Sequence, residues 1–153
     1  MLPFKRILCP TDFSEPAFTA LKRAEELARH FAAELIVAHV IPTLPSPHSF
    51  PDPQASLNFD VPLFQQELAL KAEQMLKELV SHHKVGIREV VTTGEAAPEI
   101  LRIAHQEHAD LIVIASHGQT GWRRLVFGSV TEKVVRQATC PVLTIVAPPE
   151  PEK

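Results

Sequence analysis

The stretch that decides the fold is D-L-I-V-I-A-S-H-G at residues 110–118, followed after nine residues by G-S-V-T-E at 128–132. Residues 110–114 have the length and β-branched composition of a buried strand. Residues 128–132 are typical of a helix start, whose first N–H groups lack partners and carry the positive end of the helix dipole. A glycine-bearing loop between a strand and a helix therefore predicts a site for an anionic group such as phosphate.

The rest of the chain alternates short apolar runs with amphipathic segments. Strands are expected at 5–10, 34–41, 86–92, 110–114 and 140–146. One helix is expected after a Ser14 cap, one at about 63–81, one with Pro98 in its first turn, and one at about 129–137. This order predicts a single α/β domain with a doubly wound (Rossmann-like), five-stranded parallel sheet and helices on both faces. In such folds ligands bind beyond the carboxyl ends of the strands, where the strand order reverses.

A proline-rich segment separates the second strand from the second helix. Six prolines lie between positions 42 and 62, which predicts a long loop over 43–62 that is either mobile or a lid over a ligand. The helix after it is expected to bury the apolar residues at three- and four-residue spacing, namely Phe64, Leu68, Ala72, Met75 and Leu79. We expect one domain over 1–147 and a disordered, proline-rich tail at 148–153.

Composition and charge exclude several classes of protein. The 153 residues carry a net charge of −3, which argues against a nucleic-acid partner because phosphate contacts need a basic surface. The sequence contains no apolar run near the roughly 20 residues that a membrane span needs and no secretory leader after Met1. The cysteines, Cys9 and Cys140, are expected to be reduced and too far apart to form a disulfide within one subunit. A cytoplasmic protein is the simplest interpretation.

Five motifs together resemble the universal stress protein family, UspA type, over residues 4–146. They are P-T-D-F-S at 10–14, A-H-V at 38–40, G-E-A at 94–96, the 115–131 segment and C-P-V-L at 140–143. The ATP signature of the family's ATP-binding members is Gly-x2-Gly-x9-Gly-(Ser/Thr). Here the spacing is intact, but Ala115 replaces the first glycine. Because alanine is the smallest replacement, we expect binding to survive; a Cβ would cost about 1 kcal/mol if the position needs a positive φ.

The resemblance implies an adenosine pocket and a phosphate loop. Asp12 would accept hydrogen bonds from the ribose or the base, Val40 would meet the base through its backbone, and Ala115 would pass close to the ribose. The phosphates would be held through N–H groups and hydroxyls by Gly118, Gly128, Ser129, Val130 and Thr131, and ATP would bind with Mg²⁺. The implied nucleotide-binding residues are Pro10, Thr11, Asp12, Val40, Ala115, Ser116, His117, Gly118, Gly128, Ser129, Val130 and Thr131.

Several of these residues also have simpler structural interpretations. Asp12 can cap the first helix, the glycines can serve turn geometry, and Ser129 and Thr131 can act as helix caps. His117 has no carboxylate or nucleophile near it in sequence that would make it catalytic. Neither interpretation of Arg123 and Arg124, as phosphate ligands or as surface charges, is favoured.

Other histidines are assigned structural roles. His105 and His108 have spacing that suits a metal but lack an evident third ligand, so a solvated helix face is favoured and no metal site is expected. His82 and His83 are expected to interact with a helix dipole at its carboxyl end.

The resemblance and the missing Gly-x4-Gly-Lys-(Ser/Thr) motif together predict an ATP-binding stress-response protein. It would act as a nucleotide-dependent regulatory module with little or no hydrolysis. The resemblance also implies a homodimer through the strand at 142–146. Two alternatives stay open: a nucleotide hydrolase or adenylyl-transfer enzyme, and an interaction protein that has lost nucleotide binding.

Overall fold

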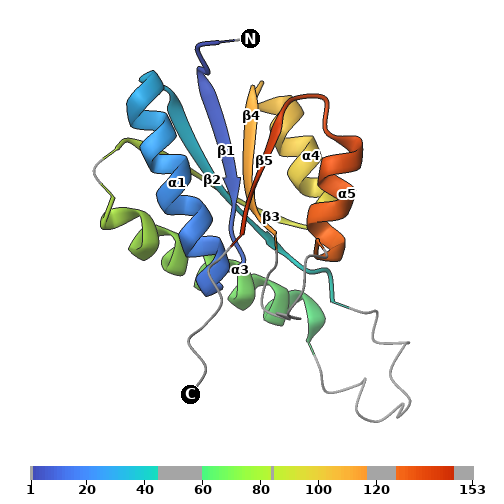
Figure 1. Cartoon of the computed structure of the whole chain (residues 1–153). Coiled ribbons are helices and arrows are strands. Elements are labelled where there is room, and N and C mark those ends of the chain that lie inside the picture. The colour runs from blue at the N-terminus through green and yellow to red at the C-terminus, as the bar shows by residue number, and fades with distance from the viewer. Residues whose placement is uncertain (1, 45–59, 84, 117–126, 147–153) are drawn as a thin grey trace, which may run out of the picture.

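The computed structural model describes residues 2–44, 60–83, 85–116 and 127–146. Its elements alternate strand and helix along the chain (Figure 1). They are β1 (Arg6–Pro10), α1 (Glu15–Phe31), β2 (Glu34–Ile41), α3 (Val61–Ser81), β3 (Ile87–Thr93), α4 (Ala96–Gln106), β4 (Leu111–Ala115), α5 (Ser129–Gln137) and β5 (Val142–Ile145).

The strands form one parallel sheet in the order β3-β2-β1-β4-β5. The central strand β1 has β2 on one side, with Arg6 opposite Glu34, and β4 on the other, with Ile7 opposite Leu111. The order therefore reverses between β1 and β4, and a crevice opens beyond their carboxyl ends. This topology confirms the predicted doubly wound fold.

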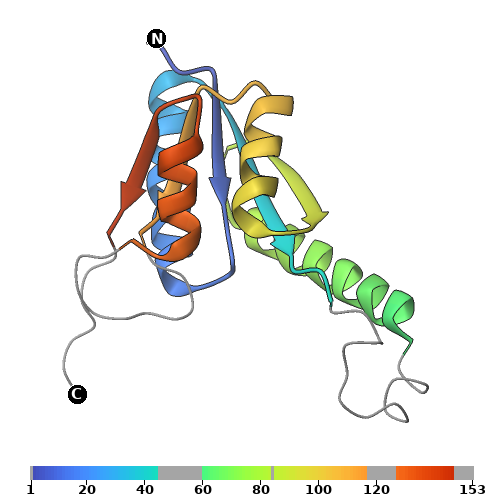
Figure 2. The same ribbon diagram turned by 90° about the vertical axis from the view of Figure 1, so that its right-hand side faces the viewer.

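Two apolar cores lie on opposite faces of the sheet. Figure 2 shows α4 and α5 on the side facing the viewer, with α1 and α3 behind the sheet. Because successive strand residues point to opposite faces, Ile7 and Cys9 of β1 join the core under α1 and α3, whereas Leu8 joins the core under α4 and α5. The expected helices on both faces are confirmed.

Side chains at the helix starts explain where α1 and α3 begin. Ser14 caps α1 and accepts a hydrogen bond from the Ala17 N–H. Asp60 caps α3 by accepting from the Leu63 N–H at 3.0 Å. Helix α3 therefore begins at Val61, and the last two residues of the expected 43–62 loop are helical, since proline is favoured in a first turn. Residues 45–59 lie outside the described part of the chain.

The buried face of α3 differs from the expected one. Ala72 and Leu76, four residues apart, are buried against the sheet, whereas Met75 is 39% exposed and Phe64 is 37% exposed. Neighbouring helix positions differ by about 100° around the axis. Because Met75 was predicted to be buried in place of Leu76, the predicted face was rotated around the helix axis relative to the observed one. The predictions that Met75 and Phe64 are buried were wrong.

A hydrogen bond joins the chain just beyond the carboxyl end of α3 to α1. The ring Nδ1 of His83 lies 2.6 Å from a carboxylate oxygen of Glu25, and both side chains are largely buried. His83 thus has a specific acidic partner on another helix, which no local pattern in the sequence indicates, and its interaction with the helix dipole stays a prediction.

Both cysteines are free, as expected: Cys9 is buried in β1, and Cys140 is half-buried before β5. Strand β5 is shorter than the expected 140–146 and starts after Pro141, which cannot donate a ladder hydrogen bond. Within the described residues, no helix is long and apolar enough to cross a membrane.

Candidate functional site

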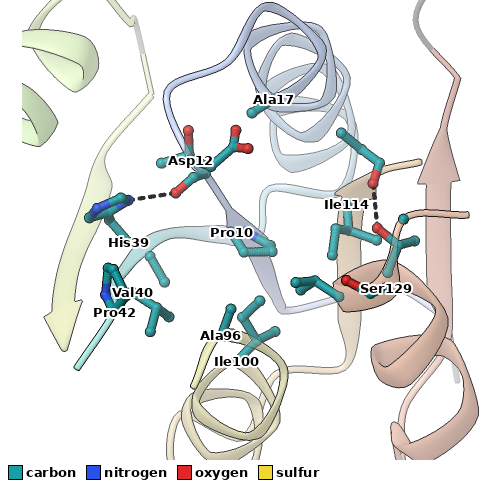
Figure 3. Close-up of a pocket in the computed structure, with 16 residues that line it drawn as sticks. Pro10, Asp12, Ala17, His39, Val40, Pro42, Ala96, Ile100, Ile114 and Ser129 are labelled. Atoms are coloured by element: carbon teal, nitrogen blue, oxygen red, sulfur yellow. Dashed lines mark hydrogen bonds between the residues drawn. The ribbon is translucent and has the colours of Figure 1, made fainter. Parts of the chain in front are cut away.

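A cavity of about 390 Å³ opens beyond the carboxyl ends of β1, β2 and β4, at the place where the strand order reverses. In Figure 3, Asp12, His39, Val40 and Pro42 lie on one side of it and Ser129 on the other. This volume is within the range of small-molecule sites. The lining residues are Pro10, Thr11, Asp12, Ala17, Ala38, His39, Val40, Pro42, Ala96, Ile100, Ile114, Ala115, Gly128, Ser129, Val130 and Thr131.

Nine of the predicted site residues line this cavity. Ser116 is buried beside it and contributes backbone hydrogen bonds, while His117 and Gly118 lie outside the described residues, as do Arg123 and Arg124. The lining residues that were predicted are Pro10, Thr11, Asp12, Val40, Ala115, Gly128, Ser129, Val130 and Thr131.

The loop after β1 has a bulky residue in an unusual backbone conformation. Phe13 has φ +61°, a left-handed conformation that is rare for a large side chain. Its N–H donates to Thr11 Oγ1 at 3.1 Å, and its ring packs on the His39 ring with centroids 4.5 Å apart. Thr11 is itself anchored, because its N–H donates to the Ala38 carbonyl at 2.8 Å. The loop is therefore held from several sides.

Asp12 takes part in the same loop and does not cap α1. Its Oδ1 accepts from the Ser14 N–H at 3.0 Å and from the Ser14 hydroxyl, while Ser14 makes the cap contact with Ala17. Of the two interpretations of Asp12, direct capping is therefore wrong. Asp12 is one of the residues that line the cavity, and one oxygen of its carboxylate is oriented by Ser14.

His39 is a lining residue that sequence reasoning missed. Its Nδ1 lies 2.8 Å from the Thr11 carbonyl (Figure 3). A carbonyl can only accept, so Nδ1 carries the proton and the ring orientation is set. His39 belongs to the A-H-V motif; its position at the carboxyl end of a strand next to the reversal point was the signal that could have found it.

The opposite wall is built by the junction of β4 and α5. Gly128 precedes α5 with φ −60° and ψ 156°, and among the described residues no side chain caps the first turn. The Gly128 N–H donates to the Ser116 carbonyl at 2.8 Å. The Thr131 hydroxyl donates to the Ala115 carbonyl at 2.8 Å, and Thr131 is 4% exposed. Thr131 lies within the first turn of α5, and no side-chain cap bond is found at this helix start among the described residues, so the cap interpretation fails for the Thr131 side chain.

Ala115 has an ordinary strand conformation. It is the last residue of β4, pairs in register with Ile145, and is not among the residues with positive φ. The loss of stability that a Cβ would cause at a position of positive φ therefore does not arise at Ala115.

The remaining wall is largely apolar. It comes from residues that carry no functional signal of their own, because small and aliphatic side chains occur in cores and pockets alike. They are Ala17, Ala38, Pro42, Ala96, Ile100 and Ile114.

Charged side chains surround the start of α4 beside this wall. Lys133 of α5 lies 2.6 Å from Glu95, the residue before α4. Glu99 accepts hydrogen bonds from Arg102 and from the Thr92 hydroxyl, at 2.7 Å for the latter. The Arg102 guanidinium first and Thr92 second hold the pKa of Glu99 below its ordinary value. These side chains hold α4 in position and are not among the residues that line the cavity.

Within the described residues, no group of three potential ligands could hold a metal ion, and His105 and His108 belong to no such cluster. Protein side chains alone therefore do not form a metal centre in this part of the chain.

Comparison with known protein families agrees with the fold. The family model described as the universal stress protein family matches residues 3–145. The chain belongs to the universal stress protein family. It is 35% identical to universal stress protein MJ0577 of Methanocaldococcus jannaschii, over 93% of this chain and 94% of that protein.

Solved structures of universal stress proteins share the architecture. The structure of MJ0577 superposes with a TM-score of 0.79 at 29% identity and covers 96% of this chain and 99% of its own. A universal stress protein from Archaeoglobus fulgidus in complex with dAMP has a TM-score of 0.61 at 23% identity, covering 94% of this chain and 98% of its own. At that identity the second likeness is one of fold.

Proposed function

We propose that this universal stress protein binds ATP and acts as a nucleotide-dependent regulatory module in the stress response, with little or no hydrolysis. The observation that carries the proposal is the cavity itself. It lies where the strand order reverses, is apolar toward α4, and ends at the first turn of α5, which no described side chain caps.

The apolar part of the cavity suits a nucleobase. Val40, Pro42 and Ile100 present aliphatic surface around the carboxyl ends of the central strands. A flat base buries its faces against such walls, and its polar edge can pair with backbone groups at the end of β2. Val40 is in our proposal the residue whose backbone meets the base.

The α5 end suits phosphate. The first-turn N–H groups of Ser129, Val130 and Thr131 face no side-chain cap among the described residues, and the helix dipole adds positive potential there. Gly128 has no Cβ, so a phosphate can approach its backbone closely. Since the Thr131 hydroxyl is already donated to Ala115, Thr131 would contribute its N–H. Pro10, Thr11, Ala115, Ser116, His117 and Gly118 complete the proposed contact set.

The chemistry of the site fits Mg²⁺ bound through the phosphates. The Ser129 hydroxyl lies on the phosphate side of the cavity, whereas Asp12 lies on the opposite side and is the carboxylate proposed to accept hydrogen bonds from the ribose. Mg²⁺ keeps several waters and needs one or two protein oxygens besides phosphate. The ion would neutralise the phosphate charge. Because the sequence has no P-loop lysine to stabilise the charge that develops during phosphate transfer, we propose that the protein binds ATP rather than hydrolyses it.

A thermal-shift experiment with a matched pair of variants tests this proposal. ATP with Mg²⁺ should raise the melting temperature of the wild type and of Gly86→Val, because a Cβ at Gly86 meets nothing within 4 Å. Gly128→Val should fold, since its φ of −60° suits any residue, but should lose the shift. A shift that survives in Gly128→Val would contradict the phosphate assignment, and phosphate release by the wild type would favour an enzyme.

We further propose a cytoplasmic homodimer that pairs through β5. This strand lies at one edge of the sheet, and Leu143 and Val146 are 40% and 72% exposed. Exposed apolar edges of sheets need covering. Light scattering should give twice the monomer mass at micromolar concentration, whereas a monomer would contradict the proposal.

A further inference from the structure

We propose that Ser14 is a positioning residue for the ribose subsite: it orients the Asp12 carboxylate and thereby sets how strongly the site distinguishes ribose hydroxyls from hydrogen. This inference rests on the nucleotide site proposed above. Ser14 itself does not line the cavity, so it would act only through Asp12.

The hydroxyl of Ser14 has two partners with opposite roles. It donates its one proton to Asp12 Oδ1, and it accepts from the Ala17 N–H at 3.3 Å. The Ser14 N–H donates to the same carboxylate oxygen at 3.0 Å. One side chain therefore joins the start of α1 to the orientation of Asp12.

The strained backbone at Phe13 makes this arrangement possible. With φ +61°, Phe13 turns the chain back so that Ser14 faces Asp12. Its conformation is held by the Thr11 hydroxyl and by the contact with His39, whose Nδ1 in turn donates to the Thr11 carbonyl. A residue in a rare backbone conformation that several contacts hold in place is typical of a functional site. The loop is thus organised before any ligand arrives.

A carboxylate held in one orientation by two donors binds a ribose hydroxyl without losing rotational freedom on binding. Removing the Ser14 hydroxyl takes away one of these two donors, so Asp12 is held less firmly and more often adopts rotamers that miss the ribose. We expect the affinity for ATP to fall about tenfold, the order associated with misalignment of a hydrogen bond to a charged group. A nucleotide without ribose hydroxyls should be unaffected.

The measured quantity is the ratio of the dissociation constant of 2′,3′-dideoxy-ATP to that of ATP, obtained by calorimetry on the full chain with Mg²⁺. Ser14→Thr keeps the hydroxyl and should keep the ratio. Ser14→Ala should lower it about tenfold. Ser14→Gly keeps most of the helix-cap stability but has no hydroxyl for Asp12, so it should lower the ratio with little change in the melting temperature.

Two controls separate positioning from stability. Asp60→Ala removes the equivalent cap from α3 and should lower the melting temperature without changing the ratio. Asp12→Ala should lower the ratio by itself, and adding Ser14→Ala should then change it no further.

The outcomes distinguish the two proposals. A wild type that binds neither nucleotide overturns the proposed function, and this inference with it. A wild type that binds ATP while Ser14→Ala or Ser14→Gly keeps the wild-type ratio overturns the role of Ser14 alone.

Discussion

The hydroxyl of Thr131 in α5 donates a hydrogen bond to the backbone carbonyl of Ala115 in β4, 2.8 Å away. Thr131 is almost fully buried. The contact joins the first turn of α5 to the end of β4, and therefore fixes the two sides of the signature relative to each other. Ala115 and Thr131 both line the cavity, so a contact between them defines its shape.

Thr131→Val should destabilise the protein by about 1–2 kcal/mol, because a buried carbonyl loses its hydroxyl donor. Urea unfolding should show the loss, and Thr131→Ser should restore most of the stability. Thr139→Val, at an exposed position, is the matched control and should be nearly neutral. Equal effects at the two positions would contradict the role of the buried hydrogen bond.

Ala115→Gly recreates the first glycine of the signature, but should not strengthen nucleotide binding. Ala115 has no positive φ and pairs with Ile145 as a regular strand residue. Glycine in a strand costs roughly 0.5–1 kcal/mol of stability, so the melting temperature should fall slightly while the affinity for ATP stays within about twofold. A large gain in affinity would mean that the Cβ obstructs the ligand.

The fold was predictable because strong local patterns agreed with the tertiary structure. The strand at 34–41 and the helix at 129–137 have the predicted bounds. In each of them the local signal, an apolar run for the strand and a helix-start pattern for the helix, agrees with the tertiary fold. The buried face of α3 was less predictable: Met75 and Leu76 are both good apolar helix residues, and only packing against the sheet decides between them.

The site was predictable where a motif marked it, and only in part elsewhere. Gly128 was marked by the spacing of the signature and Asp12 by its place at the carboxyl end of the first strand, and both line the cavity. The contacts that organise the site, from Ser14 to Asp12 and from Thr131 to Ala115, depend on side-chain geometry that spacing does not encode. The pairing of His83 with Glu25 spans two helices, and no local pattern indicates it.

Glu99 should make stability sensitive to acid. Its pKa is lowered by hydrogen bonds from Arg102 and Thr92 below the ordinary 4.5. A lowered folded-state pKa contributes stability that is complete above the unfolded value and is lost as pH falls through the folded value. The melting temperature of Glu99→Gln should thus be lower than that of the wild type at neutral pH, with a difference that shrinks below about pH 4.5.

Glu73→Gln, at an exposed position on α3, controls for this acid effect and should show a small difference that changes little with pH. A difference for Glu99→Gln that stayed constant from pH 7 to acid would contradict the pKa assignment.

Thiol labelling should separate the two cysteines. Burial raises the pKa of Cys9 to about 12, so almost no thiolate forms at pH 8, and the side chain is also inaccessible. Cys140 is only half-buried, although burial raises its pKa as well. Native protein treated with iodoacetamide should gain a single adduct slowly, at Cys140, and unfolded protein should gain two. Labelling of native Cys9, or an intact mass showing an internal disulfide, would contradict the structure.

The most direct test of the central claim is calorimetric titration of the full chain with ATP and Mg²⁺, after mass spectrometry has shown that no nucleotide co-purified. The cavity at the end of β1 and β4, bounded by the first turn of α5, predicts saturable binding of one ATP per chain with a micromolar dissociation constant. A nucleotide-free protein that takes up no ATP would contradict the account.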